Sequence, residues 1–565
     1  MLKEIRAFLR RIGANALVIA HDDEYQNETL SPDKERLAYV TGFTGSAGLA
    51  VITPRQAVLF VDGRYVEQAK KQTKFKVYHV PRQRTVGEWF TQFLRPNYIV
   101  AYDPWCHTVR QINAWSEIFA KRGAQLVPYT PNPIDKFWLT RPQPKPVHVF
   151  DYPKELAGQT TKQKISPVKR VLRLNGLDAF VVTAPDTVSW LLNKRSDAVA
   201  YAPVYLDRLI VWASGEIMSW TEDNVRLLKG KIIGVDPNEC PVKIKQDATN
   251  AGASVHLMPN PFLRQKAVKN KTEIRGMQEA GLLDSIALCQ FFARIAKHPQ
   301  KGTELSVLPQ LEMFRRQSLL YRENSFAPIS AVGRNAALPH YAPVSGKEAA
   351  LKGGILYLLD SGAHYWCGTT DVTRTVALAK PTALMKQRYT QVLKGHIDLA
   401  KAIFPQGTSG AQLDVLARGP LWNEGLDYDH GTGHGIGCFL NVHETPPTIS
   451  KYGNEPLLPG MIVSNEPGFY ARGKFGIRIE NMMMVVKEKK GRKGFFAFEM
   501  LTYLPFCDEL MDEALLSEEE KQWISDYYTE MVYRIYPRLD DETQKWMKKQ
   551  VRRWIRREGK NSTSS

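Results

Sequence analysis

Four acidic residues in the second half of this 565-residue chain lie within or beside apolar stretches that are typical of buried β-strands. Asp360 and Asp371 lie in "ILYLLDSGAHYWCGTTDVTRTVAL", where a turn separates two expected strands. Glu466 follows the apolar part of "MIVSNEPGFY", and Glu480 lies inside the expected strand "GIRIENMMMVV". Ionised carboxylates among Val, Leu and Ile are costly to bury unless they are paired or bound to metal. The fold must therefore give each acid an arginine partner, such as Arg374 or Arg478, or bring the acids together at a metal site.

The glycine-rich stretch "YDHGTGHGIGCF" (428–439) holds two histidines four residues apart. Each of its alternating glycines would cost about 1 kcal/mol relative to alanine in a helix interior, and no glutamate follows the first histidine as in the helical H-E-x-x-H motif. We therefore expect an extended or turning backbone that other segments approach closely. On a strand, residues i and i+4 point to one face, so His430 and His434 can face one site. The alternative is a glycine-rich loop with incidental histidines.

Four acids and one histidine have the composition of a two-metal site. The set is Asp360, Asp371, His434, Glu466 and Glu480. The four carboxylates neutralise two divalent cations, and such a pair of ions can lower the pKa of a water between them enough to give hydroxide near neutral pH. Oxygen-rich ligands with one imidazole and no thiolate favour Mn²⁺ or a similar ion. Arg478 precedes Glu480 by two residues, so we expect it on the same strand face as the partner of a bridging carboxylate.

The composition is that of an ordinary soluble globular protein, with 43% hydrophobic and 24% charged residues. No run of about 18 apolar residues indicates a membrane span. The first twenty residues contain only a short apolar run, "ALVIA", which is too short for a secretory signal. Six scattered cysteines without a C-x-x-C pair are typical of free thiols in a cytosolic protein. We therefore expect a cytoplasmic location.

The net charge of +18 favours acidic partners in general. Between residues 541 and 560, eight lysines and arginines stand against three acids, and Trp546 and Trp554 complete the pattern of a basic amphipathic helix. A solvated terminal helix explains this pattern, and a surface for nucleic acid or an anionic membrane is the alternative. No nucleic-acid-binding signature accompanies the charge, so we expect neither partner.

Strand and helix patterns divide the chain into three regions. Apolar strand candidates in the first region lie at 16–20, 48–53, 57–63 and 98–104, with helical patterns between several of them, which predicts a mixed sheet covered by helices. The pattern then repeats, because "LDAFVVTAPD" (177–186) resembles "ANALVIAHDD" (14–23) and "KIIGVDP" (231–237) resembles "YIVAYDP" (98–104). The proline-rich segment 140–153 is the expected join. A long helical pattern at 263–297 opens the third region, which continues as β-hairpins.

These stretches resemble the pita-bread metallopeptidases, the group that contains methionine aminopeptidase, prolidase, creatinase and aminopeptidase P. The order Asp, Asp, His, Glu, Glu matches. "DSGAHYWCGTTDVTRT", "HGTGHGIGCFLNVHE", "SNEPGFY" and "GIRIEN" are similar in particular to the three-domain, cytosolic type of aminopeptidase P, or Xaa-Pro aminopeptidase. Upstream, "TGFTGSAG", "DGRY" and "VSWLLNKR" are similar to the same family. The resemblance extends from about residue 1 to about residue 550.

The resemblance implies an α/β (α+β) fold of three domains and a tail. Two tandem creatinase-N-like α/β domains would occupy 1–145 and 154–262, and a pita-bread catalytic domain would occupy 263–535. Residues 536–565 would form a basic C-terminal tail. Cys367, in the turn of the acid-bearing hairpin, replaces a residue that relatives often have polar or acidic, and the tail beyond about residue 550 has no recognised counterpart.

The resemblance also assigns roles to the five ligands. Asp360 would hold one metal ion, and His434 and Glu466 would hold the other. Asp371 and Glu480 would bridge the two ions, which the resemblance implies are divalent ions such as Mn²⁺.

Four further residues match substrate-contacting positions of the family. His340 in "ALPHYAP" would contact substrate, and His430 and His443 would contact substrate and help to move protons. Arg64 in "DGRY" matches a first-domain arginine near the substrate. His364 and His396 have no assigned role, and the three methionines 482–484 are expected in the core.

The implied activity is hydrolysis of the bond before proline at a peptide N-terminus, by a homodimer. Prolidase, which takes only Xaa-Pro dipeptides, is the alternative enzyme, although the two-domain prefix and the histidine motif favour aminopeptidase P. A metal-free pita-bread module that binds histones, peptides or RNA is the third reading, and the complete ligand set argues against it.

Overall fold

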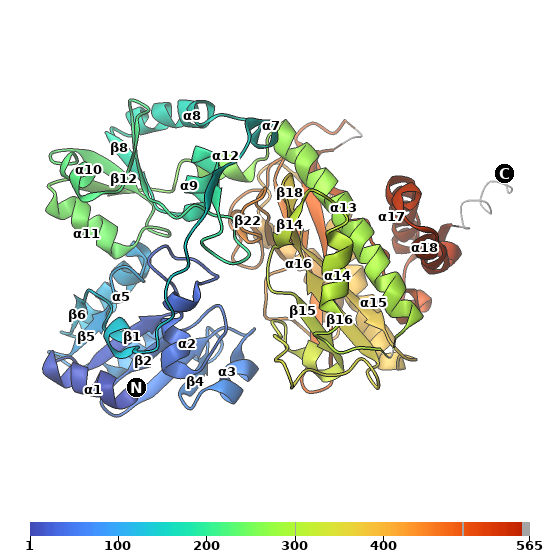
Figure 1. Cartoon of the computed structure of the whole chain (residues 1–565), viewed down its shortest axis with the longest axis horizontal. Helices are drawn as coiled ribbons and strands as arrows, with labels where there is room; N and C mark the ends of the chain where they lie inside the picture. The colour runs from blue at the N-terminus through green and yellow to red at the C-terminus, as the bar shows by residue number, and fades with distance from the viewer. Residues whose placement is uncertain (300, 489–490, 556–565) are drawn as a thin grey trace. The chain divides into compact units, whose positions relative to one another are not determined.

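The computed structural model describes residues 1–299, 301–488 and 491–555 (Figure 1). The chain divides into two compact units, Met1–Lys266 and Ala267–Ser565. No helix in the described residues is long and apolar enough to cross a membrane. All six cysteines are buried free thiols, as predicted.

The first sheet of the first unit is mixed and has the strand order β4-β3-β2-β1-β5-β6. Its strands are β1 (Ala16–Ala20), β2 (Leu49–Ile52), β3 (Ala57–Val61), β4 (Lys76–His79), β5 (Ile99–Tyr102) and β6 (Gln125–Pro128). Strand β1 is antiparallel to β2 and parallel to β5. The four strands predicted in this region are therefore confirmed. Helices α1 (Leu2–Arg11), α2 (Arg36–Thr41), α3 (Val66–Gln72), α4 (Val86–Phe93) and α5 (Val109–Lys121) accompany them.

The second sheet of this unit repeats the topology of the first without a counterpart of β4. Its order is β11-β10-β8-β12-β13, from β8 (Ala179–Val182), β10 (Leu209–Trp212), β11 (Ile217–Ser219), β12 (Ile232–Val235) and β13 (Ser254–Leu257). Strand β8 is antiparallel to β10 and parallel to β12, as β1 is to β2 and β5. The predicted tandem repeat is therefore present, with helices α8 (Thr161–Leu174), α9 (Pro185–Leu192) and α11 (Val242–Asn250).

The two repeats face each other through reciprocal backbone hydrogen bonds. The amide of Val109 donates to the carbonyl of Cys240 at 2.9 Å, and the amide of Val242 donates to the carbonyl of His107 at 3.0 Å. Each residue of the first bond has its repeat counterpart in the second, so an approximate twofold axis relates the two copies. One hydrophobic core contains buried residues of both repeats, which explains why they form one unit. Part of the predicted join pairs as β7 (Val149–Asp151) with β9 (Lys194–Ser196).

The second unit contains the acid-bearing strands in two main sheets. One has the order β15-β16-β19, and the other has the order β20-β27-β26-β23-β21-β22. The strands are β15 (Ile329–Val332), β16 (Leu356–Ser361), β19 (Val372–Ala377), β20 (Phe404–Pro405), β21 (Gly433–Gly435), β22 (Glu444–Ile449), β23 (Ile462–Asn465), β26 (Asn481–Lys487) and β27 (Phe495–Met500). Smaller sheets pair β14 (Tyr321–Asn324), β17 (Ala363–Tyr365) and β18 (Gly368–Thr369), and β24 (Gly468–Ala471) with β25 (Phe475–Arg478).

Helices of the second unit pack beside these sheets (Figure 1). They are α13 (Lys271–Lys297), α14 (Leu308–Arg315), α15 (Ala383–Ala400), α16 (Gly410–Trp422), α17 (Glu518–Ile535) and α18 (Asp541–Ile555). A Cβ on Gly395 of α15 would lie 2.1 Å from the carbonyl oxygen of Ala417 in α16, so this glycine allows the two helices to approach closely.

The helical pattern predicted at 263–297 is two helices and not one. Helix α12 (Leu263–Ala267) ends before Asn270, and α13 begins after it. The side chain of Asn270 accepts from the amide of Glu273 at 3.0 Å, and the Glu273 carboxylate accepts from the Asn270 amide at 2.9 Å. This capping box satisfies the first free amides of α13 and starts a new helix.

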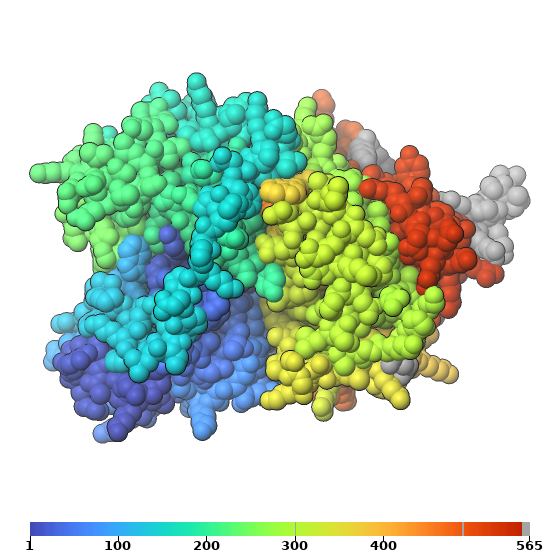
Figure 2. All heavy atoms as spheres, viewed as in Figure 1, coloured from blue at the N-terminus to red at the C-terminus, as the bar shows by residue number. Residues whose placement is uncertain are grey.

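The basic C-terminal segment forms the amphipathic helix α18. Met547, Val551 and Trp554 are buried in the main core of the second unit. Five basic side chains of the same helix are exposed: Lys545, Lys548, Lys549, Arg552 and Arg553. The helix belongs to the C-terminal segment drawn in red in Figure 2. The remaining residues of the predicted tail, 556–565, lie outside the described residues.

Candidate active site

The structure brings the five predicted ligands together from both main sheets of the second unit. Asp360 lies in β16, Asp371 directly before β19, His434 in β21, Glu466 directly after β23, and Glu480 between β25 and β26. Three groups have ligand atoms within 4.8 Å of one another: Asp360, Asp371 and Glu480; His434, Glu466 and Glu480; Asp371, His434 and His443. Asp371 and Glu480 each occur in a group with Asp360 and in a group with His434. No further metal-holding group of three occurs in the part of the chain that the structure describes.

The imidazole of His434 presents one nitrogen to the carboxylates. Its Nδ1 lies 2.8 Å from the carbonyl oxygen of Gly435, so Nδ1 carries the proton and donates it there. The other nitrogen, Nε2, lies 3.3 Å from Asp371 Oδ2 and 3.6 Å from Glu466 Oε1. A backbone carbonyl that fixes the tautomer in this way leaves Nε2 as a free metal ligand.

The glycines beside His434 allow close backbone packing. A Cβ on Gly433 would lie 2.0 Å from the carbonyl oxygen of Ser464, and a Cβ on Gly435 would lie 2.4 Å from that of Glu444. The expectation of an extended, closely approached backbone is therefore confirmed. The strand is shorter than expected, however, because His430 lies in a bend before it.

Arg478 pairs with Asp360 and not with Glu480, which corrects one prediction. Its Nη2 lies 2.5 Å from Asp360 Oδ2. Glu480 instead accepts from the hydroxyl of Thr373 at 2.7 Å. The chain leaves β25 at Arg478 and enters β26 at Asn481, so Glu480 lies between two strands rather than inside one. The two residues therefore do not share a strand face.

Burial and mutual repulsion act on these carboxylates. Asp360, Asp371 and Glu480 are 7%, 4% and 1% exposed. Burial raises the pKa of Asp360 and raises that of Glu466 to about 7. Burial and the charge of Asp371 raise the pKa of Glu480 well above its usual value.

The donor set fits divalent cations. One arginine, Arg478, neutralises one of the four acids, and the buried Oδ1 of Asp360 has no hydrogen-bond partner. Buried carboxylates without a countercharge are costly, and two divalent ions would supply it.

Sequence reasoning missed Tyr470, which links Arg478 to His430. Arg478 Nη1 donates to the Tyr470 hydroxyl at 2.6 Å, and this hydroxyl lies 2.8 Å from His430 Nε2. His430 Nδ1 lies 2.7 Å from the carbonyl oxygen of Gly431, so Nε2 accepts from Tyr470. Burial raises the pKa of Tyr470 to about 12, so the hydroxyl keeps its proton. The available signal was the last letter of "SNEPGFY".

The other three predicted substrate residues lie on separate segments of the chain. The ring of His443 lies 4.4 Å from that of His434. His340 follows Pro339, whose carbonyl accepts from Arg478 Nη2 at 3.3 Å. Arg64 belongs to the first unit, where it pairs with Asp62 at 2.8 Å, and its role stays a prediction.

The histidines without a predicted role are buried and hydrogen-bonded. His364 Nδ1 lies 3.0 Å from the hydroxyl of Thr369, and His396 Nδ1 lies 3.1 Å from the carbonyl of Asn465. The three methionines 482–484 are buried in the core, as predicted.

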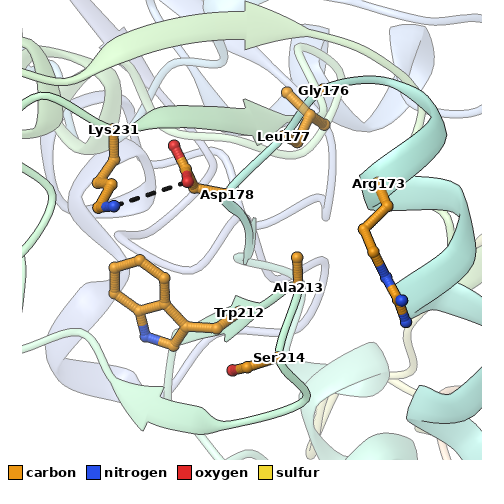
Figure 3. A pocket seen from close by; sticks show the side chains of 8 residues that line it. All are labelled: Arg173, Gly176, Leu177, Asp178, Trp212, Ala213, Ser214 and Lys231. Carbon is orange, nitrogen blue, oxygen red and sulfur yellow. Dashed lines mark ion pairs between the residues drawn. The ribbon is translucent and has the colours of Figure 1, made fainter.

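A pocket of about 430 Å³ in the second repeat of the first unit lacks the ligand residues of the carboxylate–histidine cluster (Figure 3). It is lined by Arg173, Gly176, Leu177, Asp178, Trp212, Ala213, Ser214 and Lys231. Lys231 points toward Asp178, 3.7 Å away. One acid without a histidine or cysteine is not a metal-ligand set.

Two sheets that bring four carboxylates and a histidine to one point define a metal-dependent peptidase of the pita-bread class. The model of metallopeptidase family M24 matches residues 275–487, and that of its C-terminal region matches 494–554. Creatinase/prolidase N-terminal domain models match 1–137 and 140–224.

Comparison with individual proteins identifies the family within this class of peptidases. An aminopeptidase P1 of Lotus japonicus is 35% identical, over 95% of this chain and 96% of its own length. A probable Xaa-Pro aminopeptidase P of Pyrenophora teres f. teres is also 35% identical, over 97% and 92%. The crystal structure of X-prolyl aminopeptidase from Caenorhabditis elegans, described as a cytosolic enzyme with a di-nuclear active site, has a TM-score of 0.91 and 31% identity, and covers 97% of this chain and 98% of that one. This chain belongs to the aminopeptidase P (Xaa-Pro aminopeptidase) family, and the predicted α/β fold and metal-dependent hydrolase class are confirmed.

Proposed function

We propose that this chain removes the residue before proline from the N-terminus of peptides, with two divalent ions held by Asp360, Asp371, His434, Glu466 and Glu480. The proposal rests on the observation that Asp371 and Glu480 each belong to one ligand group with Asp360 and to another with His434. A bridging role for these two carboxylates agrees with that arrangement. Asp360 would then hold one ion, and His434 and Glu466 would hold the other.

Two divalent ions held by these residues would supply the chemistry of a dinuclear hydrolase, which is a water activated near neutral pH for hydrolysis of the peptide bond. Mn²⁺ suits the oxygen-rich ligand set with one imidazole. Arg478 holds Asp360 in place through its 2.5 Å contact.

Three histidines complete the proposed substrate site. His443 lies beside His434 and orients the substrate carbonyl, and His430 moves a proton between substrate and solvent. Tyr470 holds His430 in the orientation that this requires, through its hydroxyl. His340 contacts the substrate from the loop that follows β15. Arg64, from the first unit, is proposed near the substrate on the family resemblance alone.

The proposed setting is a homodimer in the cytoplasm that acts on peptides with proline at the second position. The description of the nematode enzyme as cytosolic supports the location, and the names of the plant and fungal relatives support the peptide substrates. The homodimer rests on the family resemblance alone. No nucleic-acid or membrane partner is part of the proposal.

Peptide length distinguishes the proposed activity from that of a prolidase. The chelated protein should regain activity with Mn²⁺ and should cleave both the dipeptide Arg-Pro and the tripeptide Arg-Pro-Pro, releasing arginine. Cleavage of the dipeptide alone would identify a prolidase. Failure to bind metal and to cleave either peptide would refute the peptidase assignment.

A further inference from the structure

Glu304 is a fully buried carboxylate that lies outside the metal cluster. Its oxygens accept hydrogen bonds, and no lysine, arginine or histidine pairs with it in the described part of the chain. It lies between α13 and α14 on a segment whose next residues pack into the main core through Val307. Its backbone amide also donates to the carbonyl of Ala349 at 2.9 Å. A buried charge without a cation must be stabilised by its hydrogen-bond donors alone.

All four donor residues come from one segment, residues 332–349. The Val332 amide donates to Oε1 at 2.7 Å, and the Ala349 amide donates to Oε2 at 2.8 Å. Asn335 Nδ2 donates to Oε1 at 2.9 Å, and the Tyr341 hydroxyl donates to Oε2 at 2.8 Å. One carboxylate therefore holds the beginning, the middle and the end of this segment.

The middle of the segment carries His340. On one side, Tyr341 is anchored to Glu304. On the other side, the carbonyl of Pro339 accepts from Arg478, whose guanidinium also pairs with Asp360. His340 is thus fixed between one anchor on the core and one anchor on the metal cluster. The segment between Tyr341 and Ala349 is largely exposed, so neighbouring side chains give it little other support.

We propose that Glu304 is a positioning residue of the active site, which sets the placement of His340 against the substrate by holding the 332–349 segment. The inference rests on the role of His340 in the proposed function. Glutamine has the size of glutamate but replaces one oxygen by an NH₂ group. That group would face donors that now converge on a carboxylate, so the Glu304→Gln variant loosens the segment without emptying the space.

The test compares kcat and KM of Glu304→Gln, His340→Ala and the double variant on an Xaa-Pro tripeptide, with the metal content of each. Misplacement of a substrate group by about 1 Å costs about 10²-fold, so Glu304→Gln should lose about 10- to 100-fold in kcat/KM with unchanged metal content. The loss should divide between kcat and KM as it does in His340→Ala. The double variant should be no worse than His340→Ala alone, because Glu304 acts through His340.

Two further variants keep the test independent of a folding defect. Tyr341→Phe removes one hydroxyl from the carboxylate and should lose about fivefold in kcat/KM, the effect of one hydrogen bond. Glu520→Gln alters another buried carboxylate, which lies in α17 and pairs with Lys394 at 2.7 Å. This variant should lower thermal stability without changing kcat/KM.

Independent losses that multiply in the double variant, or loss of metal from Glu304→Gln, would overturn the inference. So would wild-type kcat/KM in Glu304→Gln when His340→Ala is impaired. Wild-type activity in His340→Ala would instead refute the substrate role of His340 in the proposed function, and an absence of peptidase activity in the unmodified, metal-loaded chain would refute that function as a whole.

Discussion

Gly433→Ala adds one methyl group where β21 lies against β23, directly before the proposed ligand His434. A Cβ at this position would lie 2.0 Å from the carbonyl oxygen of Ser464 and 2.9 Å from its carbonyl carbon. Real Cβ atoms do not approach other atoms within 3.0 Å, so the two strands must separate by about 1 Å. Both opposing atoms belong to the backbone of a sheet interior, so no side-chain rotation can relieve the overlap.

The displacement is transmitted to the metal site because His434 is the next residue. Its Nε2 lies 3.3 Å from Asp371 Oδ2, and metal-ligand distances vary by only about 0.2 Å in working sites. A shift of about 1 Å therefore removes the histidine from the coordination sphere. We expect Gly433→Ala to lose bound metal and at least about 100-fold in kcat/KM, and to lose about 1–3 kcal/mol of stability from overpacking.

Gly431→Ala is the matched control in the same motif. A Cβ on Gly431 would meet its nearest atom, the Cβ of Ser450, at 3.5 Å, which is an ordinary contact. This variant should keep its metal and its turnover. The assay is elemental analysis of metal per chain beside kcat/KM on an Xaa-Pro peptide. If Gly433→Ala keeps wild-type metal and turnover, or if both variants lose them equally, close packing of β21 does not hold the ligand in place.

Three further predictions follow from the site and the core. Glu480→Gln should abolish turnover while the fold persists by circular dichroism, since it removes a carboxylate from both ligand groups; near-normal turnover would refute the ligand set. His434→Ala should lose metal and regain part of its activity with excess Mn²⁺. His443→Ala should keep its metal and lose about 10²- to 10⁴-fold in rate, and added Mn²⁺ should not restore it. Equal metal loss in the two variants would contradict the assignment of His434 as ligand and His443 as substrate residue. Burial lowers the pKa of His107 to about 4, below the unfolded value of about 6.5, so its contribution to stability is complete above pH 6.5 and falls as the pH drops toward 4. At pH 5 the loss is about 2 kcal/mol, and His107→Gln should show a flatter dependence of unfolding free energy on pH between 7 and 5; an unchanged slope would contradict it.

Sequence patterns located the strands that depend on local periodicity. The four strand candidates of the first repeat and the similarity of 231–237 to 98–104 were found because apolar runs and their turn residues are contiguous in the chain. The pairing of β8 with β10 and β12 then follows the pairing of β1 with β2 and β5. The helix break at Asn270 was missed because helical periodicity continues across it, and only the capping contacts with Glu273 mark the boundary.

The amino-acid sequence by itself determined the chemical identity of the site. Four acids in apolar surroundings require a countercharge wherever they fold, which makes them candidate oxygen ligands of a metal ion. Alternating glycines cannot form a stable helix, so the histidines between them lie on an extended backbone that other segments can approach closely. Both conclusions follow from residue types alone. The free-energy cost of burying a charge and the low helix propensity of glycine do not depend on which residues make long-range contacts.

Only the tertiary structure decided which groups meet. Arg478 pairs with Asp360, which is 118 positions away, instead of with its near neighbour Glu480. Tyr470 contacts His430, and Glu304 collects donors from a segment that begins 28 residues later. Such pairings depend on where strands from different sheets meet, and the free energy of a buried hydrogen bond or ion pair is realised only when both partners are brought within about 3 Å. Periodicity along the chain contains no information on that distance.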